Sequence, residues 1–261
     1  MSAIYFAETS DRGDFIYKIM KIFKTRIDQA KSVFIKPNVV SLEHYPTTTH
    51  PETLDAILSH ISQKKVIVGD GHAVDTGYTK SVLANSPLAK ICDNHGVEFV
   101  DLYKKEMKKW TSPRGYTLKF SSVPFEFDFV ISLPVLKVHK QCGLSGALKN
   151  QFGYLNKVDR ILMHSRIKDI HKGIAELNVA YSTDLFIVDA IETLIKAQEC
   201  RHGGCPASLG IMIAGVDPVG LDTFGQKLLG KVDFNLEEKV KHIDYAEQYG
   251  VGKKEYEIIK I

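Results

Sequence analysis

The feature that most constrains the fold of this chain is an alternation of short apolar runs with longer amphipathic segments. The apolar runs have the length of β-strands, and the segments between them have the spacing of helices. In the first half, the strand-like runs are 3–8, 32–38, 65–71 and 97–103, and the helix-like segments are 15–27, 51–61 and 81–96. Because strands that alternate with helices form βαβ units, the pattern predicts an α/β fold. We expect a largely parallel or mixed sheet with helices on both faces.

The middle of the chain interrupts this rhythm. Residues 117–120 and 127–134 are strand-like runs separated by a short link, which indicates a local antiparallel excursion. The rhythm then returns, with helices predicted at 170–182, 217–230 and 236–250 and strands at 185–191 and 210–216. Asp217 and Pro218 suit the N-cap and first turn of one of these helices. The prediction is one domain over residues 1–261, with a possible small inserted subdomain near 105–180.

Composition excludes several classes of partner. The 261 residues carry a net charge of only +3, so the chain lacks the overall basic footprint of a nucleic-acid-binding protein. No apolar run has the length of a membrane span, and the first residues lack the basic start and apolar core of a signal peptide. We therefore expect a cytoplasmic protein with no nucleic-acid or membrane partner. The sequence is also compatible with a homo-oligomer.

The segment richest in basic and nucleophilic side chains is residues 132–157, which directly follows an apolar run. It places Lys137, His139, Cys142 and Lys149 within thirteen positions. On an extended segment Lys137 and His139 point to the same side. The following residues suit a helix capped by Ser145, whose free N–H groups and Lys149 would form an anion-binding cradle. His139 is also suited to proton transfer near neutral pH. The alternative is a basic surface turn around a buried thiol.

Polar side chains also follow other predicted strands, where ligands bind in open α/β sheets. Lys36 and Asn38 follow one strand, Asp70 and His72 the next, and Asp189 a later one. If the sheet is parallel, these loops converge. The alternative is that the same residues are solvated strand ends and turn formers.

A helix start near residue 50 has two interpretations. His50 precedes Pro51, so His50 suits the N-cap and Pro51 the first helical residue. His50 and the threonines before it would equally face a ligand at the helix N-terminus. Capping alone explains the pattern.

Histidines and cysteines suggest a metal or redox site. His164 and His171 are seven residues apart and share a face if they lie on one continuous helix; with His139 they would form a three-histidine set. Cys200, His202 and Cys205 form a CxHxxC pattern that suits a soft metal or a redox pair, to which Cys142 is a possible addition. The alternatives are solvated histidines and a glycine-rich turn with incidental thiols. No ferredoxin-type cysteine run occurs in the sequence.

Taken in order, these motifs resemble the domain of unknown function 362 (DUF362) family from about residue 32 to 230. The most specific part is the core K-x-H…GALKN-x-FG, between residues 137 and 153. Many members of that family carry ferredoxin-like cysteine clusters, which implies redox roles for them, and this chain lacks such a cluster. The residues that match the family's motif positions are Lys36, Asn38, His50, Lys137, His139, Lys149, Asn150, His164, Asp189 and Asp217.

Three functions follow from these patterns. The leading hypothesis is an enzyme, an isomerase or racemase or an oxidoreductase, that acts on a small anionic metabolite. Lys137 and Lys149 would hold a carboxylate or phosphate, His139 or His164 would move a proton, and Asp189 would orient one of them. The second is a metal- or iron–sulfur-dependent redox protein that uses the cysteines. The third is a non-catalytic protein that binds a cofactor or an acidic partner.

Overall fold

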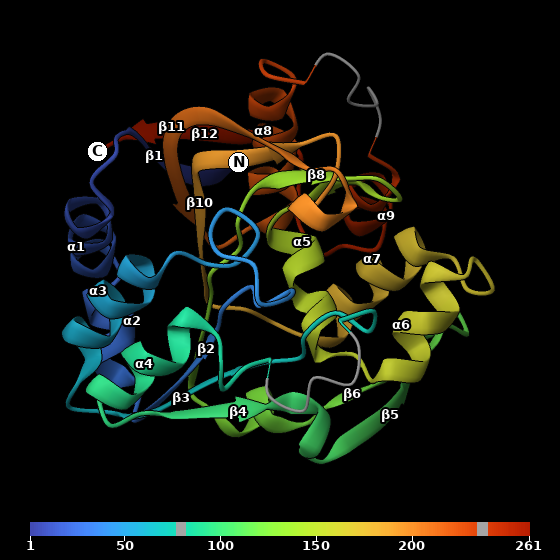
Figure 1. Cartoon of the computed structure of the whole chain (residues 1–261), viewed down its shortest axis with the longest axis horizontal. Helices are drawn as coiled ribbons and strands as arrows, with labels where there is room; N and C mark the ends of the chain where they lie inside the picture. Colours follow the sequence, from blue (N-terminus) through green and yellow to red (C-terminus); the bar gives the residue numbers. More distant parts are fainter. Residues whose placement is uncertain (77–81, 234–239) are drawn as a thin grey trace.

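An eight-stranded sheet forms the centre of the computed structural model, which describes residues 1–76, 82–233 and 240–261 (Figure 1). Within these residues β11 runs antiparallel to both of its neighbours, and every other pairing in the sheet is parallel. The predicted largely parallel or mixed sheet is therefore confirmed. The order is β12 (Tyr256–Lys260), β1 (Ser2–Glu8), β11 (Cys205–Gly215), β10 (Leu185–Ile195), β7 (Phe129–Ser132), β2 (Ser32–Lys36), β3 (Lys65–Asp70) and β4 (Glu98–Asp101).

Helices cover both faces of this sheet because its strands are apolar on both sides. On β2, Val33 and Ile35 join one core, and Phe34 joins the other. The first core packs against α1 (Arg12–Ile22), α2 (Lys24–Gln29), α3 (Pro51–Ile61) and α4 (Pro87–Asn94). The second packs against α5 (Ala147–Asn150), α6 (Lys157–His164), α7 (Ile170–Ala180), α8 (Pro218–Leu229) and α9 (Lys241–Gln248).

In the described part of the chain, two hairpins lie outside the main sheet. The first pairs β5 (Met107–Thr111) with β6 (Thr117–Ser121), and the second pairs β8 (Lys137–His139) with β9 (Gly143–Ser145). The predicted strand at 117–120 is thus antiparallel, but its partner is β5, whereas the run at 127–134 supplies β7 of the main sheet. Short 3-10 turns connect the elements at Leu102–Lys104, Val123–Glu126, Gln151–Tyr154 and Cys200–His202.

Three predicted helices are shorter than expected, and the causes are local. The segment 15–27 is divided between α1 and α2 at Phe23. The helix predicted from residue 81 begins at Pro87, because Ser86 caps it; residue 81 itself lies outside the described residues. The helix predicted at 236–250 is described only from residue 240, and α9 begins at Lys241.

The continuous helix that would carry both His164 and His171 is not formed. α6 ends at His164, and Arg166 has a left-handed backbone with φ of 64°. Asp169 then caps α7 by accepting hydrogen bonds from the N–H groups of His171 and Lys172. These features turn the chain, so the two histidines lie on separate helices.

The parallel strands bring polar residues to one edge of the sheet. The carboxyl ends of β2, β3 and β7 carry Lys36, Asp70 and Ser132. β8, β9, α5 and α6 follow β7 in the chain, and each supplies residues that lie in one pocket with Lys36 and Asp70. The described residues include no helix long and apolar enough to cross a membrane.

Candidate functional site

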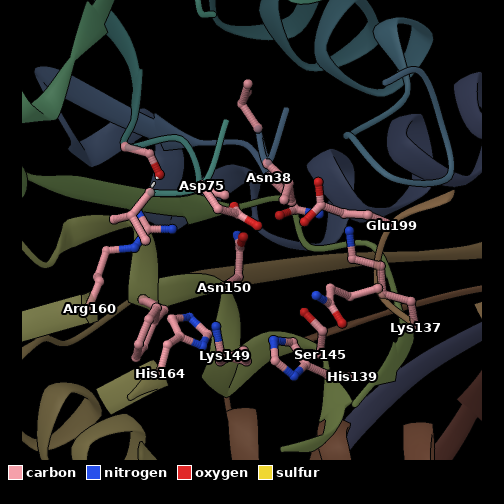
Figure 2. A pocket seen from close by; sticks show the side chains of 18 of the residues that line it. Asn38, Asp75, Lys137, His139, Ser145, Lys149, Asn150, Arg160, His164 and Glu199 are labelled. Atoms are coloured by element: carbon pink, nitrogen blue, oxygen red, sulfur yellow. Dashed lines mark hydrogen bonds between the residues drawn. The ribbon is translucent and has the colours of Figure 1, made fainter. Parts of the chain in front are cut away.

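A pocket of about 350 Å³ lies beyond the carboxyl ends of β2 and β3. Its walls come from these strand ends, the β8–β9 hairpin, α5, α6 and the turn after β10 (Figure 2). The structure therefore brings most of the predicted site residues together. Those that line the pocket are Lys36, Asn38, Asp70, Lys137, His139, Ser145, Lys149, Asn150, His164 and His202.

Lys36 and Asp70 form a buried ion pair at the base of the pocket. The Lys36 Nζ lies 2.5 Å from Asp70 Oδ1 and also donates to the Pro37 carbonyl. The same carboxylate accepts from the N–H groups of Val39 and Gly71. Burial lowers the pKa of Lys36, and the Asp70 charge opposes that shift. Because each charge has its partner, this pair joins β2 to β3 and leaves little charge for a ligand.

The β8–β9 hairpin presents Lys137, His139 and Ser145 on one face. Lys137 pairs with Ser145 in the antiparallel register, and His139 lies two positions along the same strand. The Nζ of Lys137 donates to the Thr47 carbonyl, and the side chain is buried. Desolvation lowers the pKa of Lys137 to about 7; nearby Glu199 opposes this shift and Lys149 adds to it. The predicted common orientation of Lys137 and His139 is present, since both line the pocket.

Lys149 is a buried cation that makes no hydrogen bond or ion pair with the described residues. Its Nζ lies 3.7 Å from the centroid of the Phe152 ring, and the side chain points into the pocket (Figure 2). Desolvation lowers the pKa of Lys149 to about 8, and the neighbouring charge of Arg160 contributes. A lysine in this state is stabilised by an anion brought into the pocket.

Arg160 is a charged pocket residue that was not predicted from the sequence, and the buried carboxylate of Glu199 is another. Arg160 is 7% exposed, and its guanidinium donates to the carbonyls of Gly71 and His72 and to the Tyr103 hydroxyl. Its Nε has no hydrogen-bond partner, and no carboxylate among the described residues pairs with it. The spacing of Arg160 and His164 by four residues was the available clue, because it places both on one face of α6.

The charges on this side of the pocket do not balance. Lys36 and Asp70 neutralise each other, whereas Lys149 and Arg160 remain without a carboxylate among the described residues. Unpaired buried cations cost several kcal/mol each unless a ligand or a pKa shift compensates. The arrangement is therefore electrostatically suited to a carboxylate or a phosphate.

His139 and His164 present opposite hydrogen-bonding groups to the pocket. The Nδ1 of His139 accepts from the N–H groups of Gln141 and Cys142, so the neutral ring carries its proton on Nε2. The amide nitrogen of Gln141 donates to the Met163 and His164 carbonyls, so its oxygen accepts from His164 Nδ1 at 2.9 Å. The neutral His164 ring therefore has an unprotonated Nε2. The two rings are nearly parallel, with centroids 6.0 Å apart.

The surroundings favour the neutral form of both imidazoles, although His139 is buried and His164 is exposed at the pocket. Burial, followed by the charge of Lys149, places the pKa of His139 well below its usual value. The pKa of His164 is lowered to about 4, first by desolvation and then by the charges of Lys149 and Arg160. At neutral pH the pocket thus holds one imidazole donor and one imidazole acceptor.

The predicted anion cradle at the helix N-terminus is wrong. Ser145 ends β9, Gly146 is the N-cap of α5, and no side chain caps from that position. The carboxylate of Asp222 from α8 instead accepts from the N–H groups of Ala147 at 2.6 Å and Leu148 at 2.9 Å. Because this buried carboxylate occupies the helix N-terminus, the pocket cations left without a carboxylate partner among the described residues are Lys149 and Arg160.

Asp189 and His50, which were predicted to act on or bind the ligand, lie outside the pocket. Asp189 accepts from Arg12 Nε at 2.7 Å and from the Tyr45 hydroxyl at 2.7 Å, so it orients neither His139 nor His164. His50 caps α3 through Nδ1 and packs edge-on against Tyr45. The capping interpretation of His50 is therefore the one that the structure supports.

The cysteines do not assemble a metal site within one chain. Cys142 is buried in the apolar core, Cys200 is exposed, and Cys205 is half-buried. His171 stacks on His242, with centroids 5.9 Å apart, and does not join His139 and His164. The predicted Cys142, Cys200, Cys205 and His202 set and the three-histidine set are thus not brought together in the described residues.

Among the described residues one group has the spacing of metal ligands, and it lies at the rim of the pocket. It consists of Asp75, Glu199 and His202, whose ligand atoms lie within 4.8 Å of one another. Arg201 already pairs with both carboxylates, at 2.8 Å from Asp75 and 2.6 Å from Glu199. These contacts explain the group as an ion-pair network.

Comparison with known proteins shows the family and the fold. In three-dimensional structure the chain is similar to the lactate racemase apoprotein from Thermoanaerobacterium thermosaccharolyticum, with 14% identity, a TM-score of 0.57 and coverage of 89% of this chain and 58% of that one. It is also similar to a protein from Thermotoga maritima, with 12% identity, a TM-score of 0.46 and coverage of 90% and 59%. This chain therefore spans less than two thirds of either protein.

The sequence comparison is more specific than the structural one. No curated protein sequence matches the chain. The model of the domain of unknown function DUF362 matches residues 33–227, which is most of the chain and agrees with the extent of the resemblance in the sequence. The chain therefore belongs to the DUF362 family.

Proposed function

We propose that this protein is an enzyme that binds a small carboxylate- or phosphate-bearing metabolite and transfers protons on it. The observation that carries the proposal is the pair of pocket cations, Lys149 and Arg160, that have no carboxylate partner among the described residues. A ligand with one or two negative charges would compensate them. Arg160 is suited to a planar carboxylate, and Lys149 adds a point charge.

The imidazole pair supports proton transfer as the reaction type. His139 offers an Nε2–H donor, and His164 offers an Nε2 lone pair. An acid and a base placed together are what isomerisation or racemisation at a carbon next to a carboxylate requires. Because the charges of Lys149 and Arg160 contribute to the low pKa of His164, a bound anion would raise that pKa and make His164 a better base.

The structural neighbour is consistent with this reaction class. The lactate racemase from Thermoanaerobacterium thermosaccharolyticum is named for its action on lactate, a small 2-hydroxy acid. At 14% identity the likeness concerns the fold, so it supports the choice of ligands to test and leaves the substrate to experiment.

Anion binding is tested by isothermal titration calorimetry with L-lactate, D-lactate, glycolate and inorganic phosphate. We expect at least one of these anions to bind, and Arg160→Met and Lys149→Met to lower the affinity by about tenfold or more each, the loss of a charge-assisted contact. Lys90→Met, at an exposed lysine of α4, is the matched control and should bind as wild type. Equal binding by all four proteins would overturn the proposal.

Proton transfer is tested by NMR in D2O. For the anion that binds, exchange of the hydrogen on the carbon next to the carboxylate reports abstraction, and it should fall by at least about a hundredfold in His164→Gln and in His139→Gln. Tight binding without any exchange or turnover would instead favour a non-catalytic protein that binds an anionic cofactor.

A further inference from the structure

Lys137 differs from the other two buried lysines of the pocket. Lys36 is paired with Asp70, and Lys149 makes no polar contact with the described residues. Lys137 is 1% exposed, donates to the Thr47 carbonyl, and has no carboxylate within 4.0 Å among the described residues. Lys137 is nevertheless one of the residues that line the pocket. One carbonyl acceptor orients the amine without stabilising its positive charge as a carboxylate would.

We propose that Lys137 is a nucleophilic amine that forms an imine with the carbonyl carbon of an aldehyde or a 2-oxo acid. The inference rests on the proposed function, because the anionic end of such a ligand would lie on Lys149 and Arg160. Figure 2 shows Lys137 and Arg160 on opposite sides of the pocket with Lys149 between them. A carbonyl compound that also carries a carboxylate therefore has a partner for each of its two groups.

The environment supplies the neutral amine that this chemistry needs. A lysine becomes nucleophilic when it is desolvated or lies beside another cation. Desolvation is the main cause for Lys137; the charge of Lys149 adds to it and that of Glu199 opposes it. The resulting pKa of about 7 leaves a substantial neutral fraction at physiological pH. Thr47 accepts one N–H hydrogen, which leaves the lone pair of the neutral amine available for the ligand.

The step balances without an oxidant or reductant. The Nζ lone pair forms a bond to the carbonyl carbon, and the carbonyl π electrons move to oxygen, which gains a proton. The nitrogen then loses a proton, and the new hydroxyl group gains a second one. The nitrogen lone pair expels that oxygen as water to give a protonated C=N bond, which releases its proton to leave the neutral imine. Ser145 pairs with Lys137 in the hairpin, and His139 lies on the same face with its Nε2–H, so both are placed to move these protons.

Borohydride trapping tests the inference on the full-length protein. The protein is incubated with glyoxylate, pyruvate or 2-oxoglutarate, reduced with sodium borohydride, digested and mapped by mass spectrometry. We expect a reduced adduct on Lys137 in at least about tenfold excess over the adduct on exposed Lys90, and its loss in Lys137→Met and Lys137→Arg. An adduct that maps to Lys149, or equal labelling of Lys137 and Lys90, would overturn it. Because mapping uses the wild-type chain, the test holds even if a variant fails to fold.

A parallel titration separates this inference from the proposed function. Lactate and glycolate carry a carboxylate but no carbonyl that forms an imine, so their binding reports the anion site alone. Binding of these anions without trapping of any of the three oxo acids would leave the anion site in place and reject the role of Lys137. Trapping on Lys137 that is unaffected by Arg160→Met would uphold the amine and reject the anion site.

Discussion

At the scale of single residues, the pocket shows how surroundings decide what a cation does. Lys36 lies beside Asp70 and serves to join two strands. Lys149 and Arg160 lack such a partner among the described residues, so their positive charges in the pocket are not compensated by a carboxylate of this part of the chain. Lys36 thus has a structural role, whereas Lys149, which lines the same pocket, has a ligand-binding role in our proposal.

The uncompensated charge of Lys149 should make both the stability of the fold and its affinity for anions depend on pH. The pKa of Lys149 is about 8 in the folded protein, against an ordinary value of 10.5. Between these values the unfolded chain binds more protons, so the free energy of unfolding should rise as pH increases from about 8 to 10. Anion affinity should fall over the same range, because the bound anion favours the charged lysine. Urea unfolding and calorimetry at several pH values measure both trends.

Lys149→Met is the matched variant for this pH prediction. It removes the titrating amine but keeps a side chain of similar length. The free energy of unfolding and the anion affinity should therefore change less with pH than in wild type. Identical slopes in the two proteins would show that Lys149 does not titrate in this range.

Gly153 should tolerate no side chain. A Cβ there would lie 2.0 Å from Asp70 Oδ1 and 2.6 Å from Lys36 Nζ, so Gly153→Ala must displace the buried ion pair. We expect a loss of about 3 kcal/mol in the free energy of unfolding, measured with urea. Gly13→Ala is the control: its nearest neighbour would be 3.4 Å away, and on helix α1 it should change stability by less than about 1 kcal/mol. Similar losses in both variants would contradict the explanation.

The site residues that sequence reasoning could identify are those on one continuous segment. Lys137, His139 and Lys149 are close in sequence, and their periodicity places them together in space. Arg160 was missed because an arginine on a short amphipathic helix ordinarily faces solvent. Asp189 was placed wrongly because a strand end indicates an edge of the sheet but not which neighbouring loop it contacts.

At the scale of elements, α5 depends on a carboxylate from another helix. α5 has only four residues and carries Lys149 and Asn150, yet no residue of its own caps it. Asp222 from α8 takes over this role. A short helix is marginal in isolation, so the placement of Lys149 depends on α8.

Asp222→Ala should therefore be costly. It leaves the N–H groups of Ala147 and Leu148 buried without acceptors, and we expect a loss of about 3 kcal/mol in the free energy of unfolding. Asp169→Ala is matched in chemistry, since Asp169 also accepts from two N–H groups, but Asp169 is exposed, and its loss should cost about 1 kcal/mol. Chemical denaturation of the two variants compares them, and equal costs would argue against a special role for Asp222.

Helix boundaries could be predicted only in part. Asp217 before Pro218 and His50 before Pro51 are local patterns, and both caps form as predicted. The break between α6 and α7 depends on the left-handed Arg166, a conformation that arginine rarely adopts and that the sequence pattern does not reveal. The cap at Asp169 was the one local indication of the break.

At the scale of the whole molecule, the alternation of strands and helices was enough to predict the fold class. It did not predict the order of the strands, because pairing between β2 and β7 or between β1 and β11 joins segments far apart in the sequence. Nor could it predict that residues 205–209 extend β11 antiparallel to β10, since their apolar pattern is weak. Long-range pairing is decided by packing of the complete sheet.

The spread of the cysteines over the molecule gives a test of the metal hypothesis. Cys200 is exposed, whereas burial raises the pKa of Cys142 to about 11 and that of Cys92 to about 12. Iodoacetamide should therefore label Cys200 at least about tenfold faster than Cys142 or Cys92 in the native protein, and urea should abolish the difference. Protection of Cys200 that is lost on treatment with a chelator would instead indicate a bound metal.

The pocket is assembled from positions as distant as Lys36 and His202, so it exists only when the whole chain is folded. A ligand that fits would therefore act as a thermal stabiliser of the entire molecule. At a hundred times its Kd, such a ligand adds about 2.7 kcal/mol, enough to raise the melting temperature by several degrees. Measuring the melting temperature in the presence of each of a set of small organic acids would thus identify the metabolite that binds the pocket.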